Sequence, residues 1–320
     1  MAGRKIPADP DVIISVIIPA HNPNPQRLQR TLFALRQQTL PAAQSECLLI
    51  DNASSPPLQS DAWAAFAPEN FRVIREAEPG LSHARRRGFA EAKAEIAVLV
   101  DDDNELAPDY LMKVRDLFSS HPKVGVLGGK SRPEFEVAPP NWTVEFHPLL
   151  ALRDLGNEPL ISAGLRPSGG ERNEYPVFAP IGAGMAIRRS AWSEWMNGAT
   201  SIRLSDRKGM ELTSAGDNDI VLCAMRAGWE AAYFPSLCLQ HLIHPTRLEP
   251  GYLARLNRGI QKSWMQVLTL HDANPWPPLT RASSLIRQFK AWFSYRAWRS
   301  PAAHIRWQGA CGHFEGRIPS

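Results

Sequence analysis

The run IAVLVDDDNEL at residues 96–106 constrains the fold of this 320-residue chain more than any other stretch. Five apolar residues lead directly into Asp101, Asp102 and Asp103. The length and β-branched content of the apolar run predict a strand that is buried on both faces. The three carboxylates then follow its C-terminal end, and in an open α/β sheet ligands bind at that edge.

Adjacent carboxylates repel one another and raise each other's pKa, so a bound cation would stabilise the cluster. Oxygen ligands at this density suit a hard divalent ion, Mg²⁺ or Mn²⁺, which often lies between carboxylates and substrate phosphates. The alternative is a solvated acidic turn after a strand, and the three residues alone do not distinguish the two interpretations.

Four apolar runs alternate with helical patterns over the first hundred residues: 13–18, 47–50, 71–74 and 96–100. This alternation predicts an α/β fold with a mostly parallel central sheet and helices on both faces. The ends of these strands carry Asn22, Asp51 and the acidic residues after position 100, and we expect them to converge on one edge of the sheet. Further along, a short strand is expected at residues 231–234, with His241 following it.

Composition narrows the class of protein. With 44% hydrophobic and 21% charged residues the chain is typical of a globular protein, and a net charge of +4 gives no reason to expect a nucleic-acid partner. There is no run of about 20 apolar residues that would span a membrane and no signal-peptide pattern at the N-terminus. The four cysteines lack metal-binding spacing and suggest reduced thiols. We therefore expect a cytoplasmic protein.

The last part of the chain has a different character. Residues 284–293 predict a helix with large apolar side chains on one face and Arg287 and Lys290 opposite. A basic amphipathic helix with aromatic residues can lie on an anionic membrane, which would place the protein at the inner membrane face. The alternative is a helix packed on its own domain.

The chemistry expected from these residues involves a nucleotide. The chain has no Walker sequence and no GxGxxG after a strand, but Gly80 begins a turn and helix start that carries Arg85, and helix N-termini and arginine both favour phosphate. Among the three arginines 85–87, we expect Arg85 to point inward. Asn22, Asp51 and Arg85 would hold a nucleotide diphosphate, with a divalent ion between Asp103 and its phosphates.

A base is also needed to deprotonate an attacking hydroxyl. Asp217 is the candidate, at the start of a predicted helix that ends at Gly228. Its alternative role is that of a helix N-cap, which Asp fills well. Asp219, two residues later, would point elsewhere on that helix.

The order of these segments resembles family 2 glycosyltransferases, which have the GT-A fold. The resemblance rests on five segments that occur in the family's order: Ile17-Ile18-Pro19-Ala20-His21-Asn22, Leu49-Ile50-Asp51-Asn52, Gly80-Leu81-Ser82-His83-Ala84-Arg85, Asp101-Asp102-Asp103, and Gly216-Asp217-Asn218-Asp219 with Arg226 and Gly228 downstream. The family usually has Glu at the position of Gly216 and an aromatic residue before Asn22, so this chain departs from the pattern at both places.

The resemblance implies a role for each matching residue. The nucleotide sugar would be bound by Pro19, Ala20, Asn22, Asp51, Arg85, Asp101 and Asp102. Asp103 and His241 would hold Mn²⁺ or Mg²⁺, and Asp217 would be the base of an inverting displacement. The donor-sugar and acceptor pocket would be shaped by Gly182, Ala183, Gly184 and Asp219.

The resemblance also implies an organisation and a task. Residues 1–245 would form the GT-A glycosyltransferase domain, with a nucleotide-binding half (11–105) and an acceptor and catalytic half (106–245), and residues 246–320 a helical basic and aromatic extension. The expected activity is transfer of a sugar from a nucleotide-diphosphate sugar to a glycan or lipid-linked acceptor in cell-surface polysaccharide or lipopolysaccharide assembly. The alternatives are a non-catalytic nucleotide-sugar binding protein and a sugar-1-phosphate nucleotidyltransferase.

Overall fold

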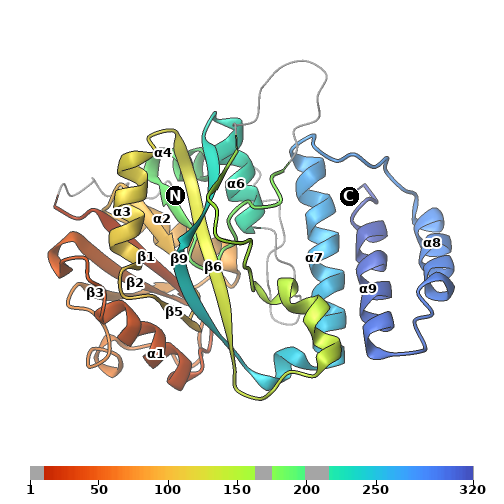
Figure 1. The fold of residues 1–320 in the computed structure, drawn as a ribbon, viewed down its shortest axis with the longest axis horizontal. Helices are drawn as coiled ribbons and strands as arrows, with labels where there is room; N and C mark the ends of the chain where they lie inside the picture. Colours follow the sequence, from red (N-terminus) through yellow and green to blue (C-terminus); the bar gives the residue numbers. More distant parts are fainter. Residues whose placement is uncertain (1–10, 163–174, 199–215, 320) are drawn as a thin grey trace.

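One nine-stranded sheet forms the centre of the computed structural model, which describes residues 11–162, 175–198 and 216–319 (Figure 1). The strand order is β3 (Phe71–Glu76), β2 (Ser45–Asn52), β1 (Ile14–Ala20), β4 (Ile96–Leu99), β8 (Ala186–Arg188), β6 (Val124–Phe135), β9 (Glu230–Ile243) and β5 (Asn104–Leu106), with β7 (Leu160–Ile161) paired to β9. The first four strands are parallel, and beyond β4 the sheet is mixed because β8, β5 and β7 run antiparallel to their neighbours.

The apolar run before the acidic residues lies in the middle of this sheet. Ile96 and Val98 point into the core shared with α1 (Pro25–Arg36) and α3 (Tyr110–Ser120), while Ala97 and Leu99 point into the core shared with α2 (Leu81–Glu91), α4 (Arg189–Asn197) and α6 (Gly216–Arg226). Because alternate side chains enter two separate cores, every residue of β4 has to be apolar.

Helix α2 begins at Leu81, and its N-cap is Gly80, whose φ of 141° suits glycine. The helix then crosses β1 so closely that a Cβ on Gly88 would lie 2.3 Å from Cγ2 of Ile17. This close approach fixes which face of α2 turns toward the sheet.

Strand β9 is much longer than the expected residues 231–234. It pairs in parallel with β6, and the register shifts between Gly128 and Lys130, opposite the stretch of β9 that contains Pro235. This irregularity accommodates Pro235, which follows the expected strand directly, and β9 continues beyond it. As a result His241 lies within β9, opposite Asn104 of β5, instead of in a loop after the strand.

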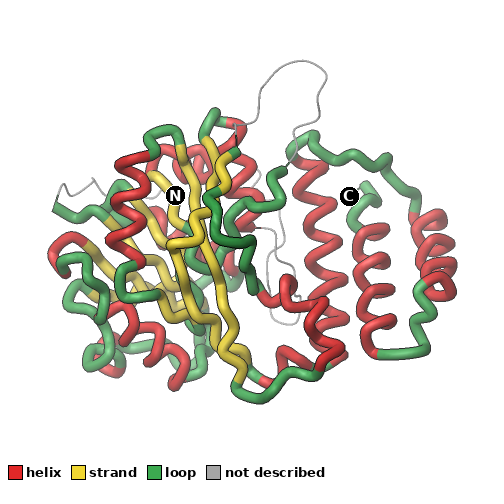
Figure 2. The backbone as a smooth tube through the Cα atoms, viewed as in Figure 1, coloured by secondary structure: helices red, strands yellow, loops and turns green. Residues whose placement is uncertain are grey.

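In the described chain after β9, the regular elements are all helices, joined by loops (Figure 2). They are η4 (Pro245–Leu248), α7 (Pro250–Leu270), α8 (Arg281–Ser294) and α9 (Pro301–Glu315), and α9 lies between α7 and α8 (Figure 1). Helix α7 packs against η3 (Asn141–Leu150).

No helix in the described ranges is long and apolar enough to cross a bilayer. None of the four cysteines, all of which lie in those ranges, forms a disulfide.

A buried polar cluster joins three helices. Asp219 of α6 is fully buried and accepts hydrogen bonds from Nε1 of Trp195 in α4 and from Nε2 of His271 at the end of α7, both at 2.7 Å. Nη1 of Arg226 lies 3.4 Å from Nδ1 of His271, and since a guanidinium only donates, Nδ1 is the acceptor and Nε2 carries the proton. The carboxylate thus has partners on two neighbouring helices.

This cluster generates a stability prediction. His271→Ala leaves Oδ1 of the buried Asp219 carboxylate with only the weak thiol donor of Cys223, at 3.9 Å, so we expect the free energy of unfolding to fall by about 1–3 kcal/mol. Chemical denaturation followed by circular dichroism measures it. His83→Ala is the matched control, because His83 is partly exposed and its charged contact among the described residues is with Glu78 at 3.3 Å. Equal losses in the two variants would contradict a stabilising role for the cluster.

Candidate active site

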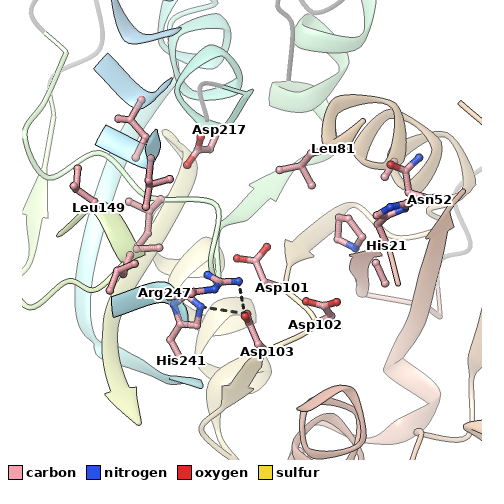
Figure 3. Close-up of a pocket in the computed structure, with 18 of the residues that line it drawn as sticks. His21, Asn52, Leu81, Asp101, Asp102, Asp103, Leu149, Asp217, His241 and Arg247 are labelled. Atoms are coloured by element: carbon pink, nitrogen blue, oxygen red, sulfur yellow. Dashed lines mark hydrogen bonds and ion pairs between the residues drawn. The ribbon is translucent and has the colours of Figure 1, made fainter. Parts of the chain in front are cut away.

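A cavity of about 490 Å³ opens at the carboxyl ends of the central parallel strands (Figure 3). β1 contributes Pro19 and Ala20, β2 contributes Asn52, and the acidic residues follow β4. Asp217, at the start of α6, faces them from across the cavity (Figure 3). Strand ends that are distant in sequence meet here because parallel strands present their carboxyl ends on one edge of the sheet.

Asp101, Asp102 and Asp103 all line this cavity, and Asp103 is the most buried. Its Oδ2 accepts a hydrogen bond from Nη2 of Arg247 at 2.9 Å, and its Oδ1 lies 3.2 Å from Nε2 of His241. Burial alone would raise the pKa of Asp103, but the charges of Arg247 and His241 outweigh it and hold that pKa below its usual range. Asp103 is therefore a carboxylate at neutral pH.

Asp102 shows the opposite effect. Burial raises its pKa to about 7, and the charges of Asp103 and Asp101 add to the shift. Asp102, which has no ion-pair partner among the described residues, thus takes up a proton at a higher pH than Asp103 does.

The residues around Asp103 fit a divalent ion. Two donor atoms held about 2.1 Å from one octahedral ion lie about 3 Å apart, which is close to the 3.2 Å between Oδ1 of Asp103 and Nε2 of His241. Both ring nitrogens of His241 are buried and neither has a hydrogen-bond partner in the described structure. A buried imidazole with unused nitrogens beside a carboxylate is a suitable ligand pair for Mn²⁺ or Mg²⁺.

Three of the expected nucleotide ligands, Asn22, Asp51 and Arg85, are not among the residues that line the cavity. Asp51 is buried, and its oxygens accept hydrogen bonds from the backbone N–H groups of Ser54 and Leu58 and from Arg75. These bonds offset the effect of burial and lower the pKa of Asp51. Its neighbour Asn52 faces the cavity instead, because successive side chains of a strand point to opposite sides.

Asn22 is likewise occupied in joining two loops. With φ at 46°, it accepts a hydrogen bond on Oδ1 from the N–H of Ser55, and its own N–H donates to Oγ of Ser54. The neighbouring His21 lines the cavity, and its Nδ1 lies 2.7 Å from the carbonyl oxygen of Asn52. His21 and Asn52 are therefore the polar groups on this wall where Asn22 and Asp51 were expected.

Arg85 is the buried member of its arginine run, as the sequence predicted, with 4% of its surface exposed. Its Nε and Nη1 have no hydrogen-bond partner among the described residues. A Cβ built on Gly182 would lie 2.5 Å from Nη2 of Arg85 and 3.5 Å from Oδ2 of Asp217, so both side chains border the same glycine. Leaving two nitrogens of a buried cation without hydrogen bonds is costly, which favours an anion as a further partner for Arg85.

Asp217 is held by the glycine-rich segment before β8. The N–H of Gly182 donates to Oδ2 of Asp217 at 2.9 Å. Gly184 has φ at 76°, and its carbonyl accepts a hydrogen bond from the hydroxyl of Tyr110 at 2.6 Å. Ala183 is buried, and none of Gly182, Ala183 and Gly184 is among the residues that line the cavity, so this segment holds Asp217 through Gly182 without bordering the pocket itself.

Asp219 does not line the cavity. The expectation that it shapes the sugar pocket is wrong, because a residue two positions after Asp217 on a helix turns about 200° away and enters the α4–α7 junction. Asp219, Cys223 and His271 each bring one potential metal-ligand atom within 4.8 Å of the others. Both oxygens of Asp219 already accept hydrogen bonds there, so we interpret this group as a structural network.

Sequence reasoning missed one wall of the cavity altogether. Apolar residues of η3 and α7 form it: Pro148, Leu149, Leu150, Tyr252, Leu256 and Ile260. Arg153 and Arg247 also border the cavity, and burial lowers the pKa of Arg153. No motif marks these residues, because they reach the site through the packing of α7 and the long course of β9.

Comparison with known proteins supports one family. The family model for glycosyl transferase family 2 matches residues 15–195. An uncharacterized protein of Sinorhizobium fredii, y4gI, is 30% identical over 118 residues, which are 36% of this chain and 13% of that protein.

The fold is shared with a solved structure. The crystal structure of GalNAc-T7 with UDP, GalNAc and Mn²⁺ superposes with a TM-score of 0.55 at 16% identity, over 96% of this chain and 56% of that chain. This likeness confirms the α/β GT-A fold expected from the sequence. The family model spans more than half of the chain, from β1 to α4, and this protein therefore belongs to glycosyl transferase family 2.

Proposed function

We propose that this chain is an inverting, metal-dependent glycosyltransferase that moves a sugar from a nucleotide-diphosphate sugar to an acceptor hydroxyl. One observation carries the proposal: Asp103 and His241 lie on one side of the cavity and Asp217 lies across it, in a member of a glycosyltransferase family. This arrangement leaves space for a donor between a metal-binding group and a base.

The nucleotide would lie against the ends of β1 and β2. Pro19 and Ala20 offer an apolar surface for a base, and the polar groups of His21 and Asn52 lie beside it. Asp102 and Asp101 would face the ribose and the phosphate side. In this assignment Asn22 and Asp51 position the loops that carry the contact residues. The presence of UDP and Mn²⁺ in the GalNAc-T7 crystal structure supports a nucleotide donor and a divalent metal in a protein of this fold.

The diphosphate would lie between the acidic residues and Arg85. When bound by Asp103 and His241, Mn²⁺ or Mg²⁺ would neutralise the charge that develops on the leaving diphosphate. Arg85 would donate hydrogen bonds to the phosphate oxygens, which would satisfy its unused Nε and Nη1. Arg247 would hold Asp103 in its ionised, oriented form.

Asp217 would act as the base. One displacement by an acceptor hydroxyl requires a proton acceptor on the side of the sugar that faces away from the diphosphate, and Asp217 is across the cavity from the acidic residues (Figure 3). The Gly182 N–H fixes one carboxylate oxygen. The apolar wall from η3 and α7 supports an acceptor with an apolar part, such as a lipid-linked glycan in cell-surface polysaccharide or lipopolysaccharide assembly at the cytoplasmic side of a membrane.

Donor hydrolysis tests the activity directly. The purified chain with Mn²⁺ and a panel of UDP-, GDP- and dTDP-sugars should release nucleoside diphosphate from at least one donor, and EDTA should abolish the release. Tight donor binding without turnover on any donor or acceptor would support a non-catalytic binding protein instead. Exchange of pyrophosphate with the donor would support a sugar-1-phosphate nucleotidyltransferase.

Asp217→Asn separates the base from the binding groups. The amide oxygen can still accept the Gly182 hydrogen bond, but the base is lost, so we expect kcat to fall by roughly 10²–10⁴ with donor affinity nearly unchanged. Titration calorimetry with the donor and steady-state kinetics measure the two quantities. Asp109→Asn, at an exposed ion pair with Lys113, is the matched control. Unfolding together with loss of donor binding would mean that Asp217 is only a helix cap.

Arg85→Gln should lower the affinity for the donor without lowering the free energy of unfolding. Since two of the guanidinium nitrogens have no partner, removing the charge breaks few native interactions, and we expect the free energy of unfolding to stay constant or rise. Donor affinity should fall about tenfold or more, because charge-assisted hydrogen bonds to phosphate are lost. Arg87→Gln, on the exposed face of the same helix, should change neither quantity by much. Unaltered donor affinity in Arg85→Gln would refute the phosphate role.

A further inference from the structure

Helix α8 carries its large apolar side chains on the outside. Leu285, Ile286, Phe289 and Phe293 are between 54% and 66% exposed, and we call them the α8 apolar face. At about 100° per residue they fall within one arc of about 100°. The helix packs inward through small residues on the opposite side, Ser284 and Ala291, which are its two buried residues.

The exposed surface extends past the end of the helix. Tyr295 and Trp298 are also exposed, and the ring centroid of Trp298 lies 5.8 Å from that of Phe293. Helix α8 is the outermost helix at its end of the molecule, beyond α9 (Figure 1). The α8 apolar face is therefore turned away from the sheet and from the cavity, and packing on its own domain does not account for it.

Positive charge surrounds this surface. From residue 273 to residue 314 the sequence contains no Asp or Glu. The exposed basic side chains on and just after α8 are Arg281, Arg287, Lys290, Arg296 and Arg299. None of these five has an ion-pair partner among the described residues. A patch that combines exposed aliphatic and aromatic residues with unpaired cations matches a surface that is both apolar and anionic.

We propose that α8 and the turn after it, residues 281–299, bind the anionic surface of a lipid bilayer, with the α8 apolar face inserted among the lipid chains. Arg281 and Lys290, which flank the α8 apolar face, would contact anionic headgroups, and Tyr295 and Trp298 would lie at the level of the headgroups. A second copy of the chain fits this surface poorly, because the same five cations would face each other. The proposal goes beyond the transferase activity and does not depend on it.

Co-sedimentation with vesicles tests the proposal on the whole chain. The protein should bind vesicles of phosphatidylcholine with phosphatidylglycerol, bind phosphatidylcholine alone much less, and be released as salt rises. Leu285→Ser/Phe289→Ser/Phe293→Ser should lower the partition coefficient about tenfold or more. Arg281→Gln/Lys290→Gln should lower it roughly 25-fold on anionic vesicles, at about fivefold per charge.

A matched control separates insertion from a general loss of surface hydrophobicity. Phe33→Ser/Val137→Ser/Val177→Ser removes three exposed apolar side chains elsewhere and should leave partition unchanged. All variants should retain soluble donor hydrolysis, so failure of the membrane proposal and failure of the transferase proposal are distinguishable. Unchanged partition of the α8 variants would overturn the proposal, as would equal, salt-independent binding to neutral vesicles. If the unmodified protein does not bind vesicles but forms a dimer, and the α8 variants are monomeric, this face would belong to an interface with a second copy of the chain.

Discussion

The mutual repulsion of three consecutive carboxylates is the constraint for which the surrounding structure compensates. A buried strand has to deliver Asp101, Asp102 and Asp103 to a partly enclosed cavity, where such charges are poorly solvated. The fold brings His241 of β9 and Arg247 of η4 to Asp103. Arg247 is 144 positions away in sequence, and it reaches Asp103 because β9 runs antiparallel beside β5 and then turns into η4. The long strand and the acidic residues are thus parts of one electrostatic arrangement.

The two sides of the cavity are built in different ways. The donor side consists of strand ends and a helix start from consecutive β–α units, so its geometry follows from local sequence and the parallel sheet. The other side is assembled from η3, the start of α6 and the buried face of α7, which meet only in the folded protein. The shape of the second side therefore depends on packing between distant segments of the chain.

This division explains what could be predicted from the sequence. The α/β class, the buried central strand, the inward direction of Arg85 and the amphipathic C-terminal helix followed from periodicity and from the order of motifs. Asn22 and Asp51 were assigned to the cavity in place of His21 and Asn52, because adjacent residues at a strand end differ only in the side to which they point, and the sequence pattern does not fix that side. The extent of β9, the contact of Arg247 and the wall from α7 depend on pairings between distant segments, and no local signal encodes them.

The Asp219 cluster has a mechanical consequence for specificity. One turn of α6 carries Asp217 toward the cavity and Asp219 toward His271 at the end of α7, while Tyr252, Leu256 and Ile260 of the same α7 line the cavity. The carboxylate proposed as base and the surface proposed for the acceptor are therefore connected through the hydrogen bond between Asp219 and His271. A shift in the tilt of α7 to admit a bulkier acceptor would also displace the base. Divergence toward new acceptors is consequently easiest by exchanging individual side chains on a fixed helix, and hardest by moving the helix itself.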